Sequence, residues 1–143
     1  MTVLDASSLI SLLARQPAAE HVAELLREPD AGITSAQLAE TIDRMERVEG
    51  YPSDELLAAL DTLIDAGLSV LPIEHQDGRR AGELRAHYDN RRTRPISLAD
   101  CLLLACALRH DARIATSDRA LAGLARELSV EVLALPDSAG RLA

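Results

Sequence analysis

Residues 97–118, SLADCLLLACALRHDARIATSD, join a long apolar helix to a short apolar strand. Leucines recur at helical spacing up to His110, and Arg113–Thr116 then reads as a short run typical of a buried strand. Two acids mark this unit, because Asp100 falls in the first turn of the helix and Asp118 follows the strand directly. A helix that leads into a buried strand is the repeating unit of α/β proteins, so this stretch predicts that class.

The same alternation extends along the rest of the chain. Further strands are predicted at Thr2–Asp5, Ala31–Thr34, Leu68–Ile73 and Val130–Leu135. Helices are predicted at Ser7–Ala14, from Pro17 to Pro29, from a Ser35 cap to about Val48, from a Ser53 cap to Gly67, at Asp77–Asp89 and at Asp118–Leu128. Short apolar strands that alternate with helices indicate a parallel sheet covered on both faces. We therefore predict one domain over residues 1–143, with a central sheet of four to five strands and a loose tail over residues 136–143.

Composition narrows the function classes. The 143 residues are 48% hydrophobic and 27% charged, as in a globular domain, and with only two aromatic residues the core must be aliphatic. All fifteen cationic side chains are arginines, which excludes mechanisms that need a lysine, such as Walker-type phosphate loops and Schiff-base chemistry. The net charge of −8 and the lack of aromatic platforms argue against a general grip on nucleic acid.

The chain carries no sign of export or membrane insertion. Its N-terminus lacks a basic leader, and no stretch approaches the roughly 20 apolar residues of a membrane span. The two cysteines, Cys101 and Cys106, are expected to be small buried thiols in a reducing compartment. We expect a soluble cytoplasmic protein that makes no membrane contact.

Four acidic residues fall where the expected strands and helices meet. Asp5 ends the first strand, and Glu40 lies in the first turns of the helix after the second strand. Asp100 and Asp118 begin the helices on either side of the fourth strand. In an open parallel sheet, the carboxyl ends of strands and the N-termini of the following helices share one edge, where sites form. We expect the four carboxylates to gather at that edge.

A cluster of carboxylates calls for a cation. Like charges raise one another's pKa unless something compensates, and Mg²⁺ prefers carboxylate oxygens while it keeps several waters. The metal would lower the pKa of a bound water and neutralise charge on a phosphate. No histidine or cysteine spacing suits zinc. Each acid also has a structural alternative, as a turn residue, a helix cap or an ordinary surface glutamate.

Four segments of the sequence together resemble the PIN domain. They are Val3–Ser7 (VLDAS), Ser35–Glu40 (SAQLAE), Ser97–Ala105 (SLADCLLLA) and Ala115–Arg119 (ATSDR). The resemblance covers essentially the whole chain, with the segments in the same order. Within the family, the sequence is most similar to the VapC-type toxin ribonucleases of bacterial toxin–antitoxin pairs. The segments around Asp100 and Asp118 are the most specific.

The resemblance implies a three-layer α/β/α PIN-like fold and cleavage of RNA phosphodiester bonds by an activated water, with Mg²⁺ or Mn²⁺ as cofactor. It makes Asp5 and Asp100 the main metal ligands and gives Asp118 the metal or its waters. Glu40 would orient water. The family usually works as a homodimer bound by a small antitoxin protein, a segment of which blocks the acidic pocket.

The residues around the acids complete this expectation. Thr116 would support the site through its hydroxyl, with Ser7 as a second supporting residue. Arg91, Arg92 and Arg94 precede the Asp100 helix and could meet RNA phosphates beside the metal, although a solvated loop or an antitoxin contact is the alternative. Weak general affinity for RNA favours a narrow target, such as tRNA or another structured RNA.

Three other functions stay open. The chain could be a PIN nuclease of RNA processing outside a toxin pair, and an adjacent antitoxin gene would decide against this. It could be a catalytically silent PIN-like module that binds proteins, although such a module need not keep a repulsive acid cluster. A phosphatase of the haloacid-dehalogenase type also places an Asp after its first strand, but Ser7 stands where its second Asp is required, and no lysine is present.

Overall fold

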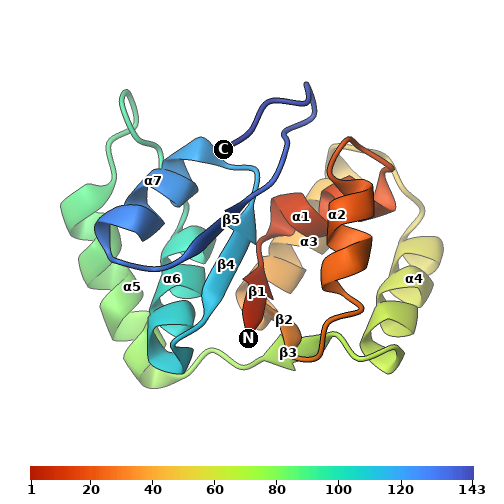
Figure 1. Cartoon of the computed structure of the whole chain (residues 1–143), viewed down its shortest axis with the longest axis horizontal. Helices are drawn as coiled ribbons and strands as arrows, with labels where there is room; N and C mark the ends of the chain where they lie inside the picture. The colour runs from red at the N-terminus through yellow and green to blue at the C-terminus, as the bar shows by residue number, and fades with distance from the viewer.

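The computed structural model describes residues 1–143 and contains one parallel sheet of five strands (Figure 1). The strands are β1 (Thr2–Leu4), β2 (Ala31–Thr34), β3 (Ser69–Leu71), β4 (Arg113–Thr116) and β5 (Val132–Ala134). Their order across the sheet is β3-β2-β1-β4-β5, and Leu4 of β1 lies opposite Ile33 on one side and Ala115 on the other. The predicted α/β class and parallel sheet are confirmed.

The chain changes direction across the sheet at β1. It steps outward from β1 to β2 and β3, then returns to the other side of β1 for β4 and β5. At such a switch point the connections leave the strands toward opposite faces, and a crevice opens beyond the carboxyl ends of the two neighbouring strands. Asp5 follows β1 and Asp118 follows β4, so both acids lie at this crevice.

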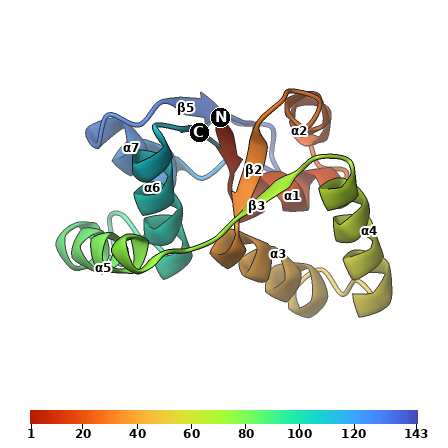
Figure 2. The ribbon, with the colours of Figure 1, turned by 90° about the horizontal axis from the view of Figure 1, so that it is seen from below.

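Helices cover both faces of the sheet, as Figures 1 and 2 show from two directions. One face carries α1 (Ala6–Leu13), α2 (Ala19–Leu25), α3 (Ser35–Arg47) and α4 (Ser53–Asp65), and the other carries α5 (His75–Tyr88), α6 (Leu98–His110) and α7 (Arg119–Glu127). Because successive strand residues point to opposite faces, Val3 and Ile114 pack with α5–α7, while Leu4 and Ala115 pack with α1–α4. Both cores are aliphatic, as the composition predicts.

Two helix caps differ from the sequence prediction. Thr34, not Ser35, caps α3, because the last residue of β2 still has extended backbone and its hydroxyl accepts the N–H of Gln37. Ser53 is the first residue of α4 and caps nothing, since Pro52 holds the cap position and the Ser53 hydroxyl donates to Glu46. In each case the helix begins one residue earlier than the preferred capping residue suggests.

The remaining differences lie at loops and at the end of the chain. The helix expected between Pro17 and Pro29 is shortened to α2, with turns on either side. The tail expected to be loose contains a hydrogen-bonded turn, in which the Asp137 carboxylate accepts the Ala139 N–H at 2.9 Å and binds the Arg141 guanidinium. None of the helices has the length and apolar character needed to cross a membrane.

Candidate active site

Asp5 is a buried carboxylate held by hydroxyl groups. It is 3% exposed and caps α1 by accepting the Ser8 N–H at 2.8 Å. The hydroxyls of Ser7 (2.8 Å) and Ser8 (2.7 Å) lie within hydrogen-bond distance of its oxygens, and Thr116 donates to Oδ2 at 2.5 Å. Burial raises the pKa of Asp5, and these hydrogen bonds offset part of the rise. Asp5 is therefore both a helix cap and a buried acid without a cation beside it.

Thr116 links the ends of β1 and β4. Its hydroxyl donates to Asp5 and accepts the Asp118 N–H at 2.9 Å, so one side chain fixes two acid-bearing segments. Ser117 adds a second link, because its hydroxyl donates to Ser7 at 2.9 Å. Both supporting residues expected from the sequence, Thr116 and Ser7, thus contact Asp5.

Asp100 has the same double character. It forms a capping box with Ser97 at the start of α6, in which Oδ2 accepts the Ser97 N–H (3.0 Å) and hydroxyl (2.7 Å). Its other oxygen, Oδ1, accepts the side-chain amide of Gln37 at 3.2 Å. Burial raises the pKa of Asp100 despite the Ser97 hydrogen bonds, and the charge of Asp118 raises it further.

Glu40 is not the ordinary surface glutamate that its sequence context allows. Its Oε2 is buried and has no hydrogen-bond partner. Burial raises the pKa of Glu40, and the nearby charge of Asp100 adds to the rise, while Arg44, one turn further along α3, opposes it. A buried carboxylate oxygen without a hydrogen-bond partner is energetically costly, so Oε2 is a candidate to bind a cation or to accept a hydrogen bond from a ligand.

Asp118 lies at the open side of the group. It caps α7, and its Oδ1 accepts the N–H groups of Ala120 (2.7 Å) and Leu121 (2.9 Å). No side chain or backbone group binds its Oδ2, and the residue is exposed. Beside it opens a cavity of about 300 Å³, whose lining includes Ser7, Arg44 and Ser117.

The structure brings all four predicted acids to one edge of the sheet. The charges of Asp5, Asp100 and Asp118 each raise the pKa of Glu40, which requires that they lie near it. The carboxylates do not converge into a finished coordination sphere, because no three acidic, histidine or cysteine side chains are placed to hold one ion. The donor set still fits a hard divalent cation, since it offers carboxylate oxygens, raised pKa values and one buried oxygen without a partner.

The sequence profile of the PIN domain matches residues 2–127. The chain belongs to the PIN-domain family.

Solved structures share this fold along nearly their whole length. The PIN domain is similar to FitAcB from Neisseria gonorrhoeae, with 22% identity over 93% of this chain and 96% of that chain and a TM-score of 0.69. It is similar to VapC20 from Mycobacterium tuberculosis, a sarcin–ricin loop cleaving toxin, with 16% identity, 87% and 95% coverage and a TM-score of 0.69. It is also similar to VapBC2 from Rickettsia felis bound to a DNA fragment from their promoter, with 16% identity, 92% and 96% coverage and a TM-score of 0.68. No curated protein sequence matches the chain.

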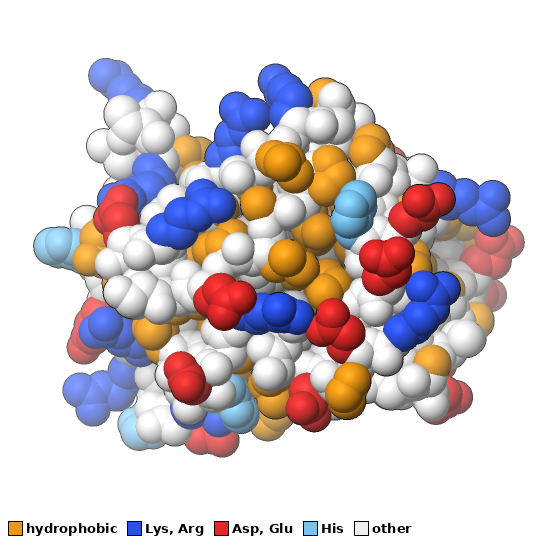
Figure 3. Space-filling model, in the orientation of Figure 1, with side chains coloured by type: hydrophobic (Ala, Val, Ile, Leu, Met, Phe, Trp, Pro, Cys, Tyr) orange, Lys and Arg blue, Asp and Glu red, His pale blue; other side chains and the backbone are white.

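The arginine loop of this PIN domain divides into two parts. Arg94 is held against the body, because its guanidinium pairs with Glu127 of α7 and lies 5.2 Å from the centre of the Tyr88 ring. Arg91 and Arg92 are exposed at the tip of the loop and form no ion pair. Figure 1 shows this loop projecting from between α5 and α6, and Figure 3, in the same orientation, shows a basic side chain at its tip. Arg94 therefore anchors the loop to α7, whereas Arg91 and Arg92 at the tip are the arginines of the loop without an ion-pair partner.

Three residues of the site escaped the sequence prediction. Ser8 and Ser117 contribute hydroxyls to the network around Asp5, and Gln37 contributes its amide to Asp100. Ser117 adjoins Asp118 in the sequence and Ser8 lies three residues after Asp5, which is a weak signal because serine is common near helix caps. Gln37 lies three residues before Glu40 on α3, so the two share a helix face.

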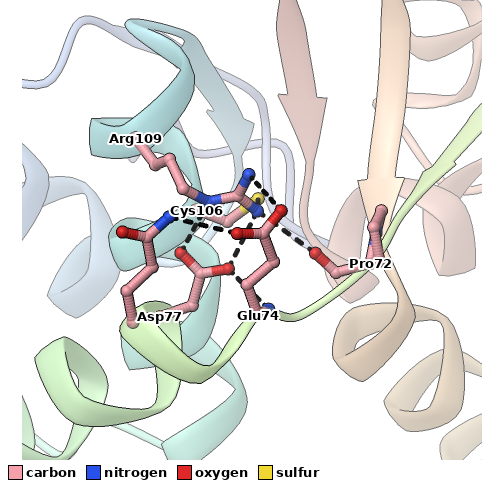
Figure 4. Close-up of polar contacts among 6 residues, drawn as sticks. Pro72, Glu74, Asp77, Cys106 and Arg109 are labelled. Carbon is pink, nitrogen blue, oxygen red and sulfur yellow. Dashed lines mark hydrogen bonds and ion pairs between the residues drawn. The ribbon is translucent and has the colours of Figure 1, made fainter.

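A second buried acid of the PIN domain lies at the far end of α6 (Figure 4). Asp77 accepts two hydrogen bonds from Arg109, from Nε and Nη2, each at 2.9 Å. Arg109 also binds Glu74 and the Pro72 carbonyl, and its Nη2 lies 3.8 Å from the Cys106 sulfur. Burial acts to raise the pKa of Asp77, but the hydrogen bonds from Arg109 and from the Glu74 backbone outweigh it and lower the pKa. This acid has its cation within the chain.

Proposed function

We propose that this PIN domain is the toxin of a toxin–antitoxin pair and acts as a Mg²⁺-dependent endoribonuclease that hydrolyses RNA phosphodiester bonds. The observation that carries the proposal is the group of four acids at the switch point of the sheet, three of them with raised pKa values and none with an ion-pair partner. Its support from other proteins is a fold shared with toxin–antitoxin complexes and with a toxin that cleaves the sarcin–ricin loop.

Each acid has a role that follows from its surroundings. Asp5 and Asp100 would hold the metal, because hydrogen bonds fix both carboxylates in place and the Oδ1 of Asp100 accepts only one of them. Asp118 offers Oδ2 to the metal or to its waters, since its Oδ1 is used by the helix cap. When bound, Mg²⁺, or Mn²⁺ in its place, supplies a water of lowered pKa and neutralises charge on the phosphate.

Glu40 and the loop tip act on the water and the substrate. The unpartnered Oε2 of Glu40 can accept a proton or a hydrogen bond from the attacking water and so orient it. Arg91 and Arg92, exposed at the tip of the loop that leads into the Asp100 helix, would contact RNA phosphates. Since the chain is acidic overall, these contacts favour a structured target, such as tRNA, over bulk RNA.

The proposed protein partners are a small antitoxin and a second copy of the chain, with the complex in the cytoplasm. Leu57 and Ile64 of α4 are 44% and 37% exposed and lie seven residues apart, hence on one face of the helix. An exposed aliphatic face of this kind suits a protein contact better than an RNA contact.

The test is cleavage of total cellular RNA by purified, antitoxin-free protein in Mg²⁺ or Mn²⁺, with and without EDTA, and with Asp100→Asn as the matched variant. New RNA 5′ ends are mapped by sequencing. We expect a small set of metal-dependent ends that vanish in the variant.

Other outcomes separate the alternatives. Identical end maps for wild type and variant would reject the nuclease and favour a silent protein-binding PIN module. Metal-dependent cleavage by a chain with no neighbouring antitoxin gene would instead favour a nuclease of RNA processing.

A further inference from the structure

Gln37 is a buried side chain that connects two acid-bearing segments. It is 1% exposed, and its backbone N–H is fixed by the Thr34 cap of α3. Its Oε1 accepts the Ala6 N–H at 2.7 Å, and its Nε2 donates to Asp100 Oδ1 at 3.2 Å. One amide thus joins the residue after Asp5 to the carboxylate of Asp100.

Both hydrogen bonds serve groups that lack another partner. Ala6 is the first residue of α1, and its N–H is one of the donors that a helix leaves unsatisfied at its start. Asp100 commits Oδ2 to Ser97, so only the Gln37 amide holds Oδ1. With both oxygens held, the plane of the Asp100 carboxylate is fixed relative to the start of α1.

A buried glutamine is energetically unfavourable at this position unless its amide is hydrogen-bonded. An amide buried without partners costs free energy, whereas methionine fills a similar volume without polar atoms. The position suits glutamine because acceptor and donor point at two different segments, 31 and 63 residues away in the sequence. This pattern matches the outer-shell hydrogen bonds that orient the carboxylate ligands of metals in proteins.

We propose that Gln37 is a positioning residue, which holds the Asp100 carboxylate at a set orientation and distance from Asp5 and so sets the affinity of the site for a divalent cation. The inference rests on the proposed role of the acids as metal ligands. It adds a fifth residue, one that touches neither metal nor RNA.

The first measurement uses the wild-type protein. The chain contains four side-chain amides, at Gln16, Gln37, Gln76 and Asn90, so their NMR signals are easily resolved. We expect the Gln37 amide protons to exchange with solvent more than about 100-fold slower than the other three, because only this side chain is fully buried and bonded at both ends. We also expect the Gln37 signal to shift when Mg²⁺ is added. A fast-exchanging signal that ignores Mg²⁺ would contradict the proposal.

The second measurement compares Gln37→Met with Thr41→Val. Thr41 is buried one turn further along α3 and donates to the Gln37 carbonyl at 2.9 Å, so its variant loses a buried hydrogen bond without touching a carboxylate. For Gln37→Met we expect the Mn²⁺ dissociation constant, from titration followed by electron paramagnetic resonance, to rise at least about 10-fold, and the Ala6 N–H to exchange faster. For Thr41→Val we expect the melting temperature to fall while the Mn²⁺ affinity stays at the wild-type value.

These variants separate the two proposals. If wild type binds Mn²⁺, Asp100→Asn does not, and Gln37→Met binds it as tightly as wild type, then Gln37 is only a structural residue. If Asp100→Asn binds Mn²⁺ like wild type, the proposed function fails as well. If Gln37→Met does not fold, the exchange and Mg²⁺ response of the wild-type amide still decide the matter.

Discussion

Helices α5 and α6 both begin with a capping box that contains an aspartate, but the two aspartates have different surroundings. Asp77 in α5 and Asp100 in α6 both occupy the third helical position of a capping box. Asp77 has a guanidinium against both oxygens, and its pKa is lowered. Asp100 has only an amide and a cap, and its pKa is raised. The comparison shows that the local sequence determines the capping box in both helices. Whether the acid also pairs with an arginine from a distant segment depends on the surrounding fold.

The largest difference between the two acids should appear in catalysis. Asp100→Asn keeps the size and the capping acceptor but removes a proposed metal ligand, so we expect cleavage to fall about 1,000-fold or more, equivalent to ~4 kcal/mol. Asp77→Asn changes the equivalent position of α5, which packs against Arg109, nine residues after Asp100 on α6. Its activity per folded molecule should stay within about two-fold of wild type. Single-turnover rates on the mapped RNA target provide the measurement, and a comparable loss in both variants would refute the contrast.

Stability should show the reverse order. Arg109→Met leaves Asp77, which is 1% exposed, without its cation, and we expect a loss of about 3 kcal/mol in the free energy of unfolding. Arg47→Met, which breaks an exposed pair with Asp43 on α3, should leave the free energy of unfolding nearly unchanged. Urea unfolding at neutral pH measures both. Equal losses would mean that the Arg109 pair is no more than a surface contact.

Removing the unpartnered acid should stabilise the protein and damage its function. Glu40→Gln relieves the repulsion among the acids, so the free energy of unfolding of the metal-free protein should rise, while cleavage should fall about 100-fold because the attacking water loses its proposed acceptor. Glu46→Gln, on the same helix, removes a carboxylate that already accepts a hydrogen bond from Ser53 and should give no such gain. A destabilised Glu40→Gln protein would show that Oε2 has a partner in solution.

Titration should separate the two kinds of acid. Asp5, Glu40 and Asp100 have raised pKa values, so the folded state binds their protons more tightly than the unfolded state does. The metal-free protein should therefore gain stability as pH falls from about 7 to about 4.5, where unfolded carboxyls begin to titrate. Asp77 has a lowered pKa, so its contribution is present above its ordinary value and is lost below about pH 4.

Thermal melting across pH, with and without Mg²⁺, tests this. Bound Mg²⁺ should cancel the gain, because protons then compete with the cation. If the melting temperature of the metal-free protein did not change with pH, the raised pKa values would be contradicted.

The smallest expected effect belongs to the loop tip. Arg91→Ala and Arg92→Ala should each raise KM for RNA about three-fold and leave kcat unchanged, since single exposed phosphate contacts position the substrate without taking part in the reaction. A plot of the logarithm of kcat/KM against the logarithm of salt concentration should have a shallower slope in each variant, by the amount expected for the loss of about one phosphate contact. An unchanged, steep salt dependence in Arg91→Ala would assign the loop to another partner.

The sequence predicts the parts of the fold that depend on local pattern. The strands Ala31–Thr34 and Arg113–Thr116 agree residue for residue with β2 and β4, because both are short, apolar and buried. The Ser97 and Asp100 capping box is likewise legible from its spacing. The family resemblance that followed from such segments is confirmed.

The parts that escaped prediction depend on contacts between distant segments. Nothing in the local sequence indicates that Gln37 bonds to Asp100, that Glu127 pairs with Arg94, or that Asp77 pairs with Arg109. Each of these pairs is more than 30 residues apart and forms only after the helices have packed. Local patterns could place the acids at one edge, but not decide which of them would meet a cation.

The hydrogen bond from Thr116 to Asp5 spans 111 residues, and β1 pairs with β4 at the same separation. A growing chain on the ribosome therefore holds half of its site from the start and the other half only when it is almost complete. Closing so long a loop is slow, so assembly of the site trails synthesis of the chain. For the proposed ribonuclease, this order of events would be a safeguard in time, because the unfinished polypeptide would have no means to cut the message that encodes it.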